Sequence, residues 1–321
     1  MIKGALFDNL RMPFVIEPES VQTEQNAPEK LFAVCREKKD FLIENLRRCG
    51  ALLLRGFGIA SEADLERFSA EFAGTDLLNY TGGASPRSRL EGKVYTSTEY
   101  PPDLTLALHN ELSYAAEFPR LLFFCCISEP QTGGETSIAD SRRILNRIEP
   151  EIVRVFKQKG VMYIRNLDAV KGSGYAWQDA FETENKRAVE THCRAIKADF
   201  EWQPNGNLRL IQTRPATATH PETGEEVWFN QAHGFHPSAL DEKTYQHFIS
   251  LMPEDDFRLN AKFGDGSLIT VEMLDQIRAV LASETVLFQW RAGDVLVLDN
   301  LLAAHGRMPF TGARKIILAM S

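Results

Sequence analysis

Apolar positions recur with helical spacing at the start of the chain. In residues 30–49 they fall three or four positions apart, and Gly50 is suited to end a helix there. The short apolar run at 51–55 then predicts a buried strand. Ser61 is placed to cap a further helix with its hydroxyl group. The pattern therefore predicts helices first, with a strand between them.

Strand-like runs dominate the remainder of the chain. Residues 78–105 are rich in Gly, Ser, Thr and Pro and predict a loop. Apolar or alternating runs predict strands at 121–127, 161–164, 207–213, 227–230, 294–299 and 315–320. Helical periodicity lies between them at 141–158 (broken or restarted at Pro150), at 238–252, and at 270–283, which Thr270 opens.

This order of elements predicts a mainly β protein with α insertions. The alternation is too irregular for a doubly wound sheet, and neither Gly-x-Gly-x-x-Gly after a strand nor a phosphate-binding Gly-x-x-x-x-Gly-Lys motif occurs. An antiparallel barrel or jelly roll decorated with helices fits better. No Pro/Gly/Ser-rich linker separates two halves, so we expect a single domain.

Composition narrows the class of protein. The 321 residues are 44% hydrophobic and carry a net charge of −8 with no basic run, which argues against nucleic acid or an anionic membrane as a partner. No segment approaches the roughly 20 apolar residues of a membrane span. The five cysteines include no Cys-x-x-Cys pair. They predict reduced thiols in a cytoplasmic protein.

Two histidines and a carboxylate are the leading candidates for chemistry. His109 and Glu111 are two residues apart and would share one face of a strand, and His305 follows the apolar run at 294–299. Such a set forms the facial triad of non-haem ferrous oxygenases, which leaves metal positions open. The spacing alone is weak, because such pairs arise by chance. A zinc hydrolase and a non-catalytic barrel with a buried polar cluster are the alternatives.

Two further groups favour the oxygenase. Arg314 precedes the final apolar run, and its guanidinium could hold a carboxylate bidentately. Gly133 to Thr136 follows the predicted strand at 121–127 and ends in a hydroxyl that could donate to the same carboxylate. An anion-binding arginine beside a site of two histidines and one carboxylate is what a 2-oxoglutarate co-substrate requires.

Several segments resemble the taurine dioxygenase family, in that family's order. They are 108–114, 119–126, 133–136, 140–142, 214–215, 220–224, 227–231 and 293–315. The His-x-Glu pair and the His-Gly-Arg-x-Pro-Phe string are similar to the clavaminate-synthase-like branch, especially to enzymes like the aspartyl hydroxylase of syringomycin biosynthesis. The resemblance extends from about residue 94 to the C-terminus. It implies one domain over 1–321, with a helical N-terminal cap in about 1–93 and the motif-bearing core in about 94–321.

The family resemblance implies a double-stranded β-helix (a cupin-like jelly roll) that uses Fe(II), 2-oxoglutarate and O2. It makes His109, Glu111 and His305 the iron ligands. A carboxylate at position 111 favours hydroxylation, desaturation or epoxidation, because related halogenases have a small residue there.

By the same resemblance, Arg314 and Thr136 bind the distal carboxylate of 2-oxoglutarate. The turn at 311–313 is shorter than in clavaminate-type members, which makes Arg307 the alternative to Arg314. We favour Arg314 because it opens the final strand.

The expected substrate is a small carboxylate-bearing molecule, hydroxylated at an aliphatic carbon. An amino acid in specialised metabolism, free or tethered to a carrier protein, fits the branch resemblance. A sulfonate or aryloxy acid is the alternative within the family. Candidate substrate residues are Arg307, Arg214, Asn230, Gln231, Ser113 and Tyr114. Arg307 is best placed to meet a carboxylate, unless it pairs with Asp299. Segments 165–200 and 237–283 are the expected lid or docking surface.

Overall fold

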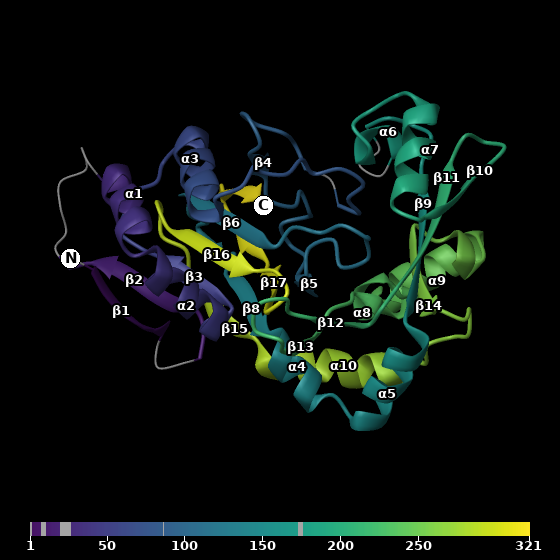
Figure 1. Cartoon of the computed structure of the whole chain (residues 1–321). Coiled ribbons are helices and arrows are strands. Elements are labelled where there is room, and N and C mark those ends of the chain that lie inside the picture. The colour runs from purple at the N-terminus through teal and green to yellow at the C-terminus, as the bar shows by residue number, and fades with distance from the viewer. Residues whose placement is uncertain (1, 8–10, 20–26, 86, 173–175) are drawn as a thin grey trace.

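Strands form the centre of the protein and helices cover them (Figure 1). The computed structural model describes residues 2–7, 11–19, 27–85, 87–172 and 176–321. Its largest sheet has seven strands, in the order β1 (Ile2–Leu6), β2 (Phe14–Pro18), β3 (Ala51–Leu54), β16 (Val295–Asp299), β6 (Leu121–Ser128), β19 (Lys315–Met320) and β4 (Tyr95–Thr96). Strands β2 and β3 are parallel and the other neighbours are antiparallel.

A second sheet faces this one across the main core. It contains β15 (Val286–Phe288), β8 (Thr136–Asp140), β17 (Ala303–Arg307) and β5 (Leu106–His109), all antiparallel. Leu122 and Phe124 of β6 pack in the same core as Ile138 of β8. The intervening Phe123 and Cys125 pack in a different core, together with residues of the N-terminal helices. Because both faces of β6 are covered, its sequence is a continuous apolar run rather than an alternating one.

The N-terminal helices lie on the outer face of the seven-stranded sheet (Figure 1). They are α1 (Ala27–Glu37), α2 (Lys39–Cys49) and α3 (Glu62–Ala73). The single helix predicted at 30–49 is therefore wrong, because the chain leaves helical geometry at Lys38. Gly50 ends α2 with a left-handed φ of 72°, and the Ser61 hydroxyl accepts a hydrogen bond from the Asp64 backbone N–H at the start of α3, both as predicted.

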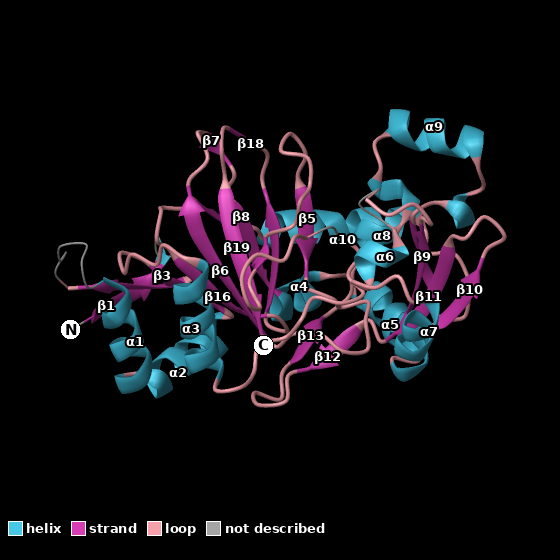
Figure 2. Cartoon of the chain, turned by 90° about the horizontal axis from the view of Figure 1, so that it is seen from above, coloured by secondary structure: helices cyan, strands magenta, loops and turns pink. Residues whose placement is uncertain are grey.

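A third group of strands stands apart from these two sheets (Figures 1 and 2). It is the four-stranded sheet β10 (Asp199–Trp202), β11 (Leu208–Arg214), β9 (Val161–Leu167) and β14 (Leu259–Phe263), which we call the outer sheet. Two-strand pairs are formed by β12 (Thr217–Thr219) with β13 (Glu226–Trp228), and by β7 (Thr132–Gly133) with β18 (Phe310–Thr311).

The remaining helices lie between the second sheet and the outer sheet or on the outer sheet itself (Figure 1). They are α4 (Ser141–Arg147), α5 (Pro150–Lys159), α6 (Trp177–Ala180), α7 (Lys186–Ala195), α8 (Ala232–Phe235), α9 (Glu242–Leu251) and α10 (Val271–Glu284), with the 3-10 turns η3 (Pro237–Ala239) and η4 (Glu254–Asp256). Pro150 begins α5 and Thr270 caps α10, as predicted.

The fold is thus mainly β with helices, as the sequence predicts. In the described part of the chain, no helix is both long enough and apolar enough to cross a bilayer. All five cysteines are buried and unpaired.

Candidate active site

His109, Glu111 and His305, which we call the triad, converge on one point. His109 ends β5 and His305 lies within β17; their Cα atoms are register partners and their ring centroids are 4.4 Å apart. One ligand atom from each member of the triad lies within 4.8 Å of the other two. These distances allow the three side chains to hold one metal ion.

One local expectation for the triad is corrected. Glu111 does not share a strand face with His109, because β5 ends at His109 and the chain turns. Leu112, with a left-handed φ of 54°, belongs to that turn. His305 follows β16 in sequence, as predicted, and lies inside the next strand, β17. The turn, rather than strand alternation, therefore directs Glu111 to the histidines.

Both imidazoles are held in the form that binds metal. The Nδ1–H of His109 donates to the Ala107 carbonyl at 2.8 Å, which leaves Nε2 with a free lone pair. Burial lowers the pKa of His109, although Glu111 opposes this effect. Burial, followed by the charges of His109 and Arg87, lowers the pKa of His305 well below its ordinary value. Neutral histidine is the ligand form, so burial favours metal binding.

Asn300, which the sequence analysis missed, fixes the backbone of Glu111. Its Oδ1 accepts from the Glu111 N–H at 2.7 Å, and its Nδ2 donates to the carbonyls of Glu111 at 2.9 Å and Pro119 at 2.8 Å. Asn300 is fully buried and directly follows β16. A polar residue at the end of an apolar strand was the available signal in the sequence.

Gln231, Ser113 and Asn230 support the same region through contacts with protein atoms. The Gln231 Nε2 donates to the Asn110 carbonyl at 2.7 Å and to the Ser113 hydroxyl at 3.1 Å. The Asn230 Nδ2 donates to the Ala216 carbonyl at 2.8 Å. All three side chains are buried. The Gln231 contacts hold the triad turn, and a substrate role for the three residues stays a prediction.

Tyr114 and Arg214 are also committed to protein contacts. The Tyr114 hydroxyl accepts from the Ala84 N–H at 2.6 Å, and its ring packs against Phe235. Arg214 ends β11 in the outer sheet and donates to the carbonyls of Thr213 and Ile196. The structure does not bring the Arg214 guanidinium to the triad.

Arg307 lies in β17 but faces a loop. Its guanidinium donates to the carbonyls of Tyr100 at 3.1 Å, Pro101 at 2.6 Å and Leu104 at 2.7 Å. The suggested pair with Asp299 is wrong, because Asp299 is instead 2.9 Å from the buried His220 Nε2. Arg307 therefore donates to three carbonyls of this loop and holds the loop in place.

Arg314 lies beside Phe310 and the backbone of Gly134. Arg314 directly precedes β19; its Nε donates to the Gly134 carbonyl at 3.2 Å, and its guanidinium lies 5.5 Å from the Phe310 ring centroid. Burial, and then the charge of Arg307, lower the pKa of Arg314 to about 10. A partly desolvated cation of this kind is suited to receive an anion.

Trp290, another residue missed from the sequence, fixes the role of the Thr136 hydroxyl. The indole Nε1–H donates to Thr136 Oγ1 at 2.8 Å. Since the hydroxyl accepts this bond, its own proton is available to a further acceptor. Thr136 and Arg307 are register partners in β8 and β17, so the hydroxyl belongs to the same sheet as His305.

Arg87 is the third residue that sequence analysis missed. It comes from the loop predicted at 78–105, yet its side chain is only 1% exposed. Its Nη2 lies 2.5 Å from Glu111 Oε2 and 3.2 Å from the Thr98 hydroxyl. Burial alone would lower the pKa of Arg87, but the Glu111 carboxylate outweighs burial and the pKa is raised. Loop arginines are usually solvated, and no local pattern marks this one as buried.

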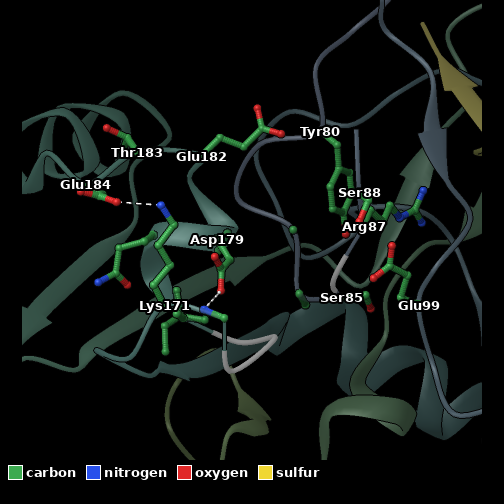
Figure 3. A pocket seen from close by; sticks show the side chains of 17 residues that line it. Tyr80, Ser85, Arg87, Ser88, Glu99, Lys171, Asp179, Glu182, Thr183 and Glu184 are labelled. Atoms are coloured by element: carbon green, nitrogen blue, oxygen red, sulfur yellow. Dashed lines mark hydrogen bonds and ion pairs between the residues drawn. The ribbon is translucent and has the colours of Figure 1, made fainter. Parts of the chain in front are cut away.

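A pocket of about 630 Å³ adjoins Arg87 (Figure 3). Tyr80, Arg87, Ser88 and Glu99 lie on one side of it, and residues between Lys171 and Glu184 lie on the other. On that far wall, Lys171 pairs with Glu184 at 2.7 Å and Asp179 accepts from the Gly172 N–H at 2.8 Å. The triad does not line this pocket; Arg87 is the contact between them.

Comparisons with known proteins show the family of the chain. The family described as "Taurine catabolism dioxygenase TauD, TfdA family" matches residues 16–320. The dapdiamide synthesis protein DdaC of Enterobacter agglomerans is 40% identical over 277 residues, which cover 86% of this chain and 83% of that protein. A clavaminate synthase-like protein of Arabidopsis thaliana is 31% identical over 324 residues, covering 98% of this chain and 94% of its own.

Solved structures show the same fold at low sequence identity. PvcB of Pseudomonas aeruginosa matches with a TM-score of 0.55 and 15% identity, over 100% of this chain and 90% of that one. AAD-2, solved with Mn(II) and N-oxalylglycine, matches with a TM-score of 0.55 and 10% identity, over 100% and 96% of the two chains. The family match excludes the zinc hydrolase and the non-catalytic barrel. The chain belongs to the TauD/TfdA family of Fe(II)- and 2-oxoglutarate-dependent oxygenases.

Proposed function

We propose that this protein hydroxylates an aliphatic C–H bond of a small carboxylate-bearing substrate, such as an amino acid, either free or bound to a carrier protein. The observation that carries this proposal is the convergence of His109, Glu111 and His305 within 4.8 Å. Similarity to a dapdiamide synthesis protein supports a place in natural product biosynthesis. Desaturation, epoxidation and the oxidation of a sulfonate or aryloxy acid are the alternatives within the family.

The residues present fit ferrous iron. Two neutral imidazoles and a carboxylate are the donors that non-haem iron prefers, and they leave positions for co-substrate and oxygen. The buried Nδ1 of His305 has no partner among the described residues, whereas its Nε2 is 3.9 Å from Glu111 Oε2. Together with 2-oxoglutarate and O2, bound iron supplies the oxidising power. His109, Glu111 and His305 would hold it, and Asn300 and Gln231 would keep the turn of Glu111 in place.

Arg314 and Thr136 are the proposed receptors for the distal carboxylate of 2-oxoglutarate. Arg314 has a single side-chain hydrogen bond among the described residues, to the Gly134 carbonyl, so most of its donors remain available. Trp290 occupies a lone pair of the Thr136 oxygen and directs the hydroxyl proton elsewhere. Arg307 is the weaker candidate, because the loop carbonyls occupy it.

The fold supports a more specific architecture than mainly β. We propose that the seven-stranded sheet and the sheet of β15, β8, β17 and β5 form a double-stranded β-helix, with α1 to α3 as the N-terminal helical region. Pairing of β3 with β16 joins residues before 94 to the C-terminal part, which supports one domain over 1–321. The unpaired cysteines are in keeping with a cytoplasmic location.

The test of this function needs no knowledge of the substrate. Protein is mixed anaerobically with Fe(II) and 2-oxoglutarate, and the visible charge-transfer band of the metal-bound keto acid is recorded. We expect the band in the wild-type protein and its loss in His305→Ala. Succinate release in air, with the product mass, then separates hydroxylation from desaturation. A wild-type protein that binds Fe(II) without forming this band would contradict the proposal.

A further inference from the structure

Arg87 is more deeply buried than its hydrogen bonds warrant. The side chain is 1% exposed, and its Nε and Nη1 have no hydrogen-bond partner among the described residues. Within the described part of the chain, Nη2 alone is hydrogen-bonded, to Glu111 and Thr98. Buried donors without partners are costly, so an acceptor from outside the protein, such as a ligand, would stabilise them. Arg87 also lines the pocket of about 630 Å³.

We propose that Arg87 is the receptor for a carboxylate of the substrate. This inference rests on the proposed function, because it takes Glu111 as an iron ligand. In that state the two positive charges of Fe(II) are matched by Glu111 and by the metal-bound carboxylate of 2-oxoglutarate, while Arg314 is matched by the distal one. Arg307 and Arg87 are then the two cations outside this count. Arg307 donates to three backbone carbonyls, whereas Arg87 would share its carboxylate partner, Glu111, with the metal. A buried unpaired charge is unfavourable, so a substrate anion is needed to balance it.

The other cations of the site are less suited to this role. The Arg307 guanidinium donates hydrogen bonds to three backbone carbonyls. The Lys171 side chain is 62% exposed and already pairs with Glu184. Arg87 lies on the side of the pocket formed by Tyr80, Ser88 and Glu99, opposite Lys171 (Figure 3). Tyr80 also supports it, since the guanidinium carbon lies 4.6 Å from the Tyr80 ring centroid.

The position of Arg87 limits which carbon is oxidised. Its Nη2 is in direct contact with Glu111, so an anion bound to Arg87 lies beside the metal site. The oxidised carbon is therefore expected within a few bonds of the substrate carboxylate rather than at the far end of a long chain. In a carrier-bound thioester the α-carboxylate is consumed, so the receptor would take a side-chain carboxylate instead.

The test compares acids with their matched amides. The anaerobic Fe(II)–2-oxoglutarate protein is titrated with free L-amino acids and their primary amides, and with N-acetylcysteamine thioesters of aspartate and glutamate against those of asparagine and glutamine. The readout is the change in the charge-transfer band. We expect at least one acid to bind, and its amide to bind at least about tenfold more weakly, because a charge-assisted contact is lost. Arg87→Gln should weaken binding of the acid to the same extent and leave binding of the amide nearly unchanged. Arg87→Lys should retain part of the affinity for the acid.

Arg89→Gln is the matched control, since Arg89 is an exposed arginine on the same loop that does not line the pocket. It should bind the acid as the wild type does. The inference is overturned if amides bind as well as acids, if Arg87→Gln binds the acid normally, or if no acid alters a band that forms normally. Absence of the band itself in the wild type would instead refute the proposed function. The ratio of the dissociation constants of acid and amide is measured on the wild type. Poor folding of Arg87→Gln therefore does not remove the test.

Discussion

His109 and His305 are direct register partners across β5 and β17, with ring centroids 4.4 Å apart, although they come from opposite halves of the chain. Neither histidine can meet the other until the second sheet has formed. The proposed metal site therefore exists only in the folded protein, and metal bound there is expected to stabilise that state.

The first prediction is that metal raises thermal stability. Mn(II) at about one hundred times its dissociation constant should stabilise the wild type by about 2.7 kcal/mol. His305→Ala should lose this increment, because the two remaining ligands hold the ion poorly. Melting temperature with and without Mn(II) is the measurement, and His247→Ala, on the exposed face of α9, is the control. An unchanged increment in His305→Ala would remove that residue from the ligand set.

A second prediction concerns Asn300. Its replacement by alanine leaves the buried N–H and C=O of Glu111 without partners. We expect a loss of about 1–3 kcal/mol in unfolding free energy, together with weaker Mn(II) binding. Urea denaturation and metal titration measure the two effects, with Asn205→Ala in an exposed turn as the control. Lower stability with normal metal affinity would mean that Asn300 holds the fold and not the ligand.

The third prediction separates Arg307, which ends β17, from Arg314, which precedes β19. Arg314→Ala should raise the 2-oxoglutarate concentration required for the charge-transfer band by at least about tenfold, since a charge-assisted contact contributes about 1.5–3 kcal/mol. Arg307→Ala should instead lower the melting temperature, because three loop carbonyls lose their donor. The opposite pattern would exchange the two roles.

The fourth prediction tests the indole of Trp290. Trp290→Phe keeps an aromatic side chain but removes the indole N–H that donates to Thr136. A bond of this kind contributes about 0.5–1.5 kcal/mol, so the 2-oxoglutarate dissociation constant should rise about two- to tenfold. Adding Thr136→Val should then cost less than it does in the wild type, because the indole acts through that hydroxyl. Fully additive effects would show that the two residues act independently.

A fifth prediction links acid stability to α10. Burial alone would raise the pKa of Glu284, but hydrogen bonds from Arg143 and Arg147 outweigh it and the pKa is lowered. A carboxylate with a lowered pKa adds stability above its unfolded pKa of about 4.3, and this stability is lost as pH falls through the folded value. Glu284→Gln should therefore destabilise the protein near neutral pH and much less at about pH 3. Equal destabilisation at both pH values would rule out the charge as the cause.

What the sequence predicts well is governed by neighbours along the chain. The apolar run of β16 and the caps at Ser61 and Thr270 depend on local chemistry, and all were located correctly. The break between α1 and α2 carries no glycine or proline signal, and it was missed.

The residues of the candidate site also differ in whether the sequence identifies them. His109, His305 and Glu111 were found as candidates because few residue types bind metal ions. Arg87, Trp290 and Asn300 were not, since each acts on a partner far away in sequence: Glu111, Thr136 and again Glu111. Gln231 contacts the triad turn and Asn230 contacts the Ala216 carbonyl, so tertiary contacts engage the amide groups of both. Residue type alone does not distinguish these uses.

The pairing of β8 with β15 brackets a long segment of the chain whose sequence can change without changing the triad. These strands are neighbours in the sheet, yet the whole stretch from Ser141 to Thr285 lies between them in sequence. That stretch carries the pocket wall from Lys171 to Glu184, whereas His109, Glu111 and His305 all lie outside it. Insertions or exchanges in this wall can therefore alter which molecules are admitted while the hydrogen bonds that join β5, β8 and β17 are kept. Under the proposed function, this wall of the pocket can change while the residues that would hold iron are kept.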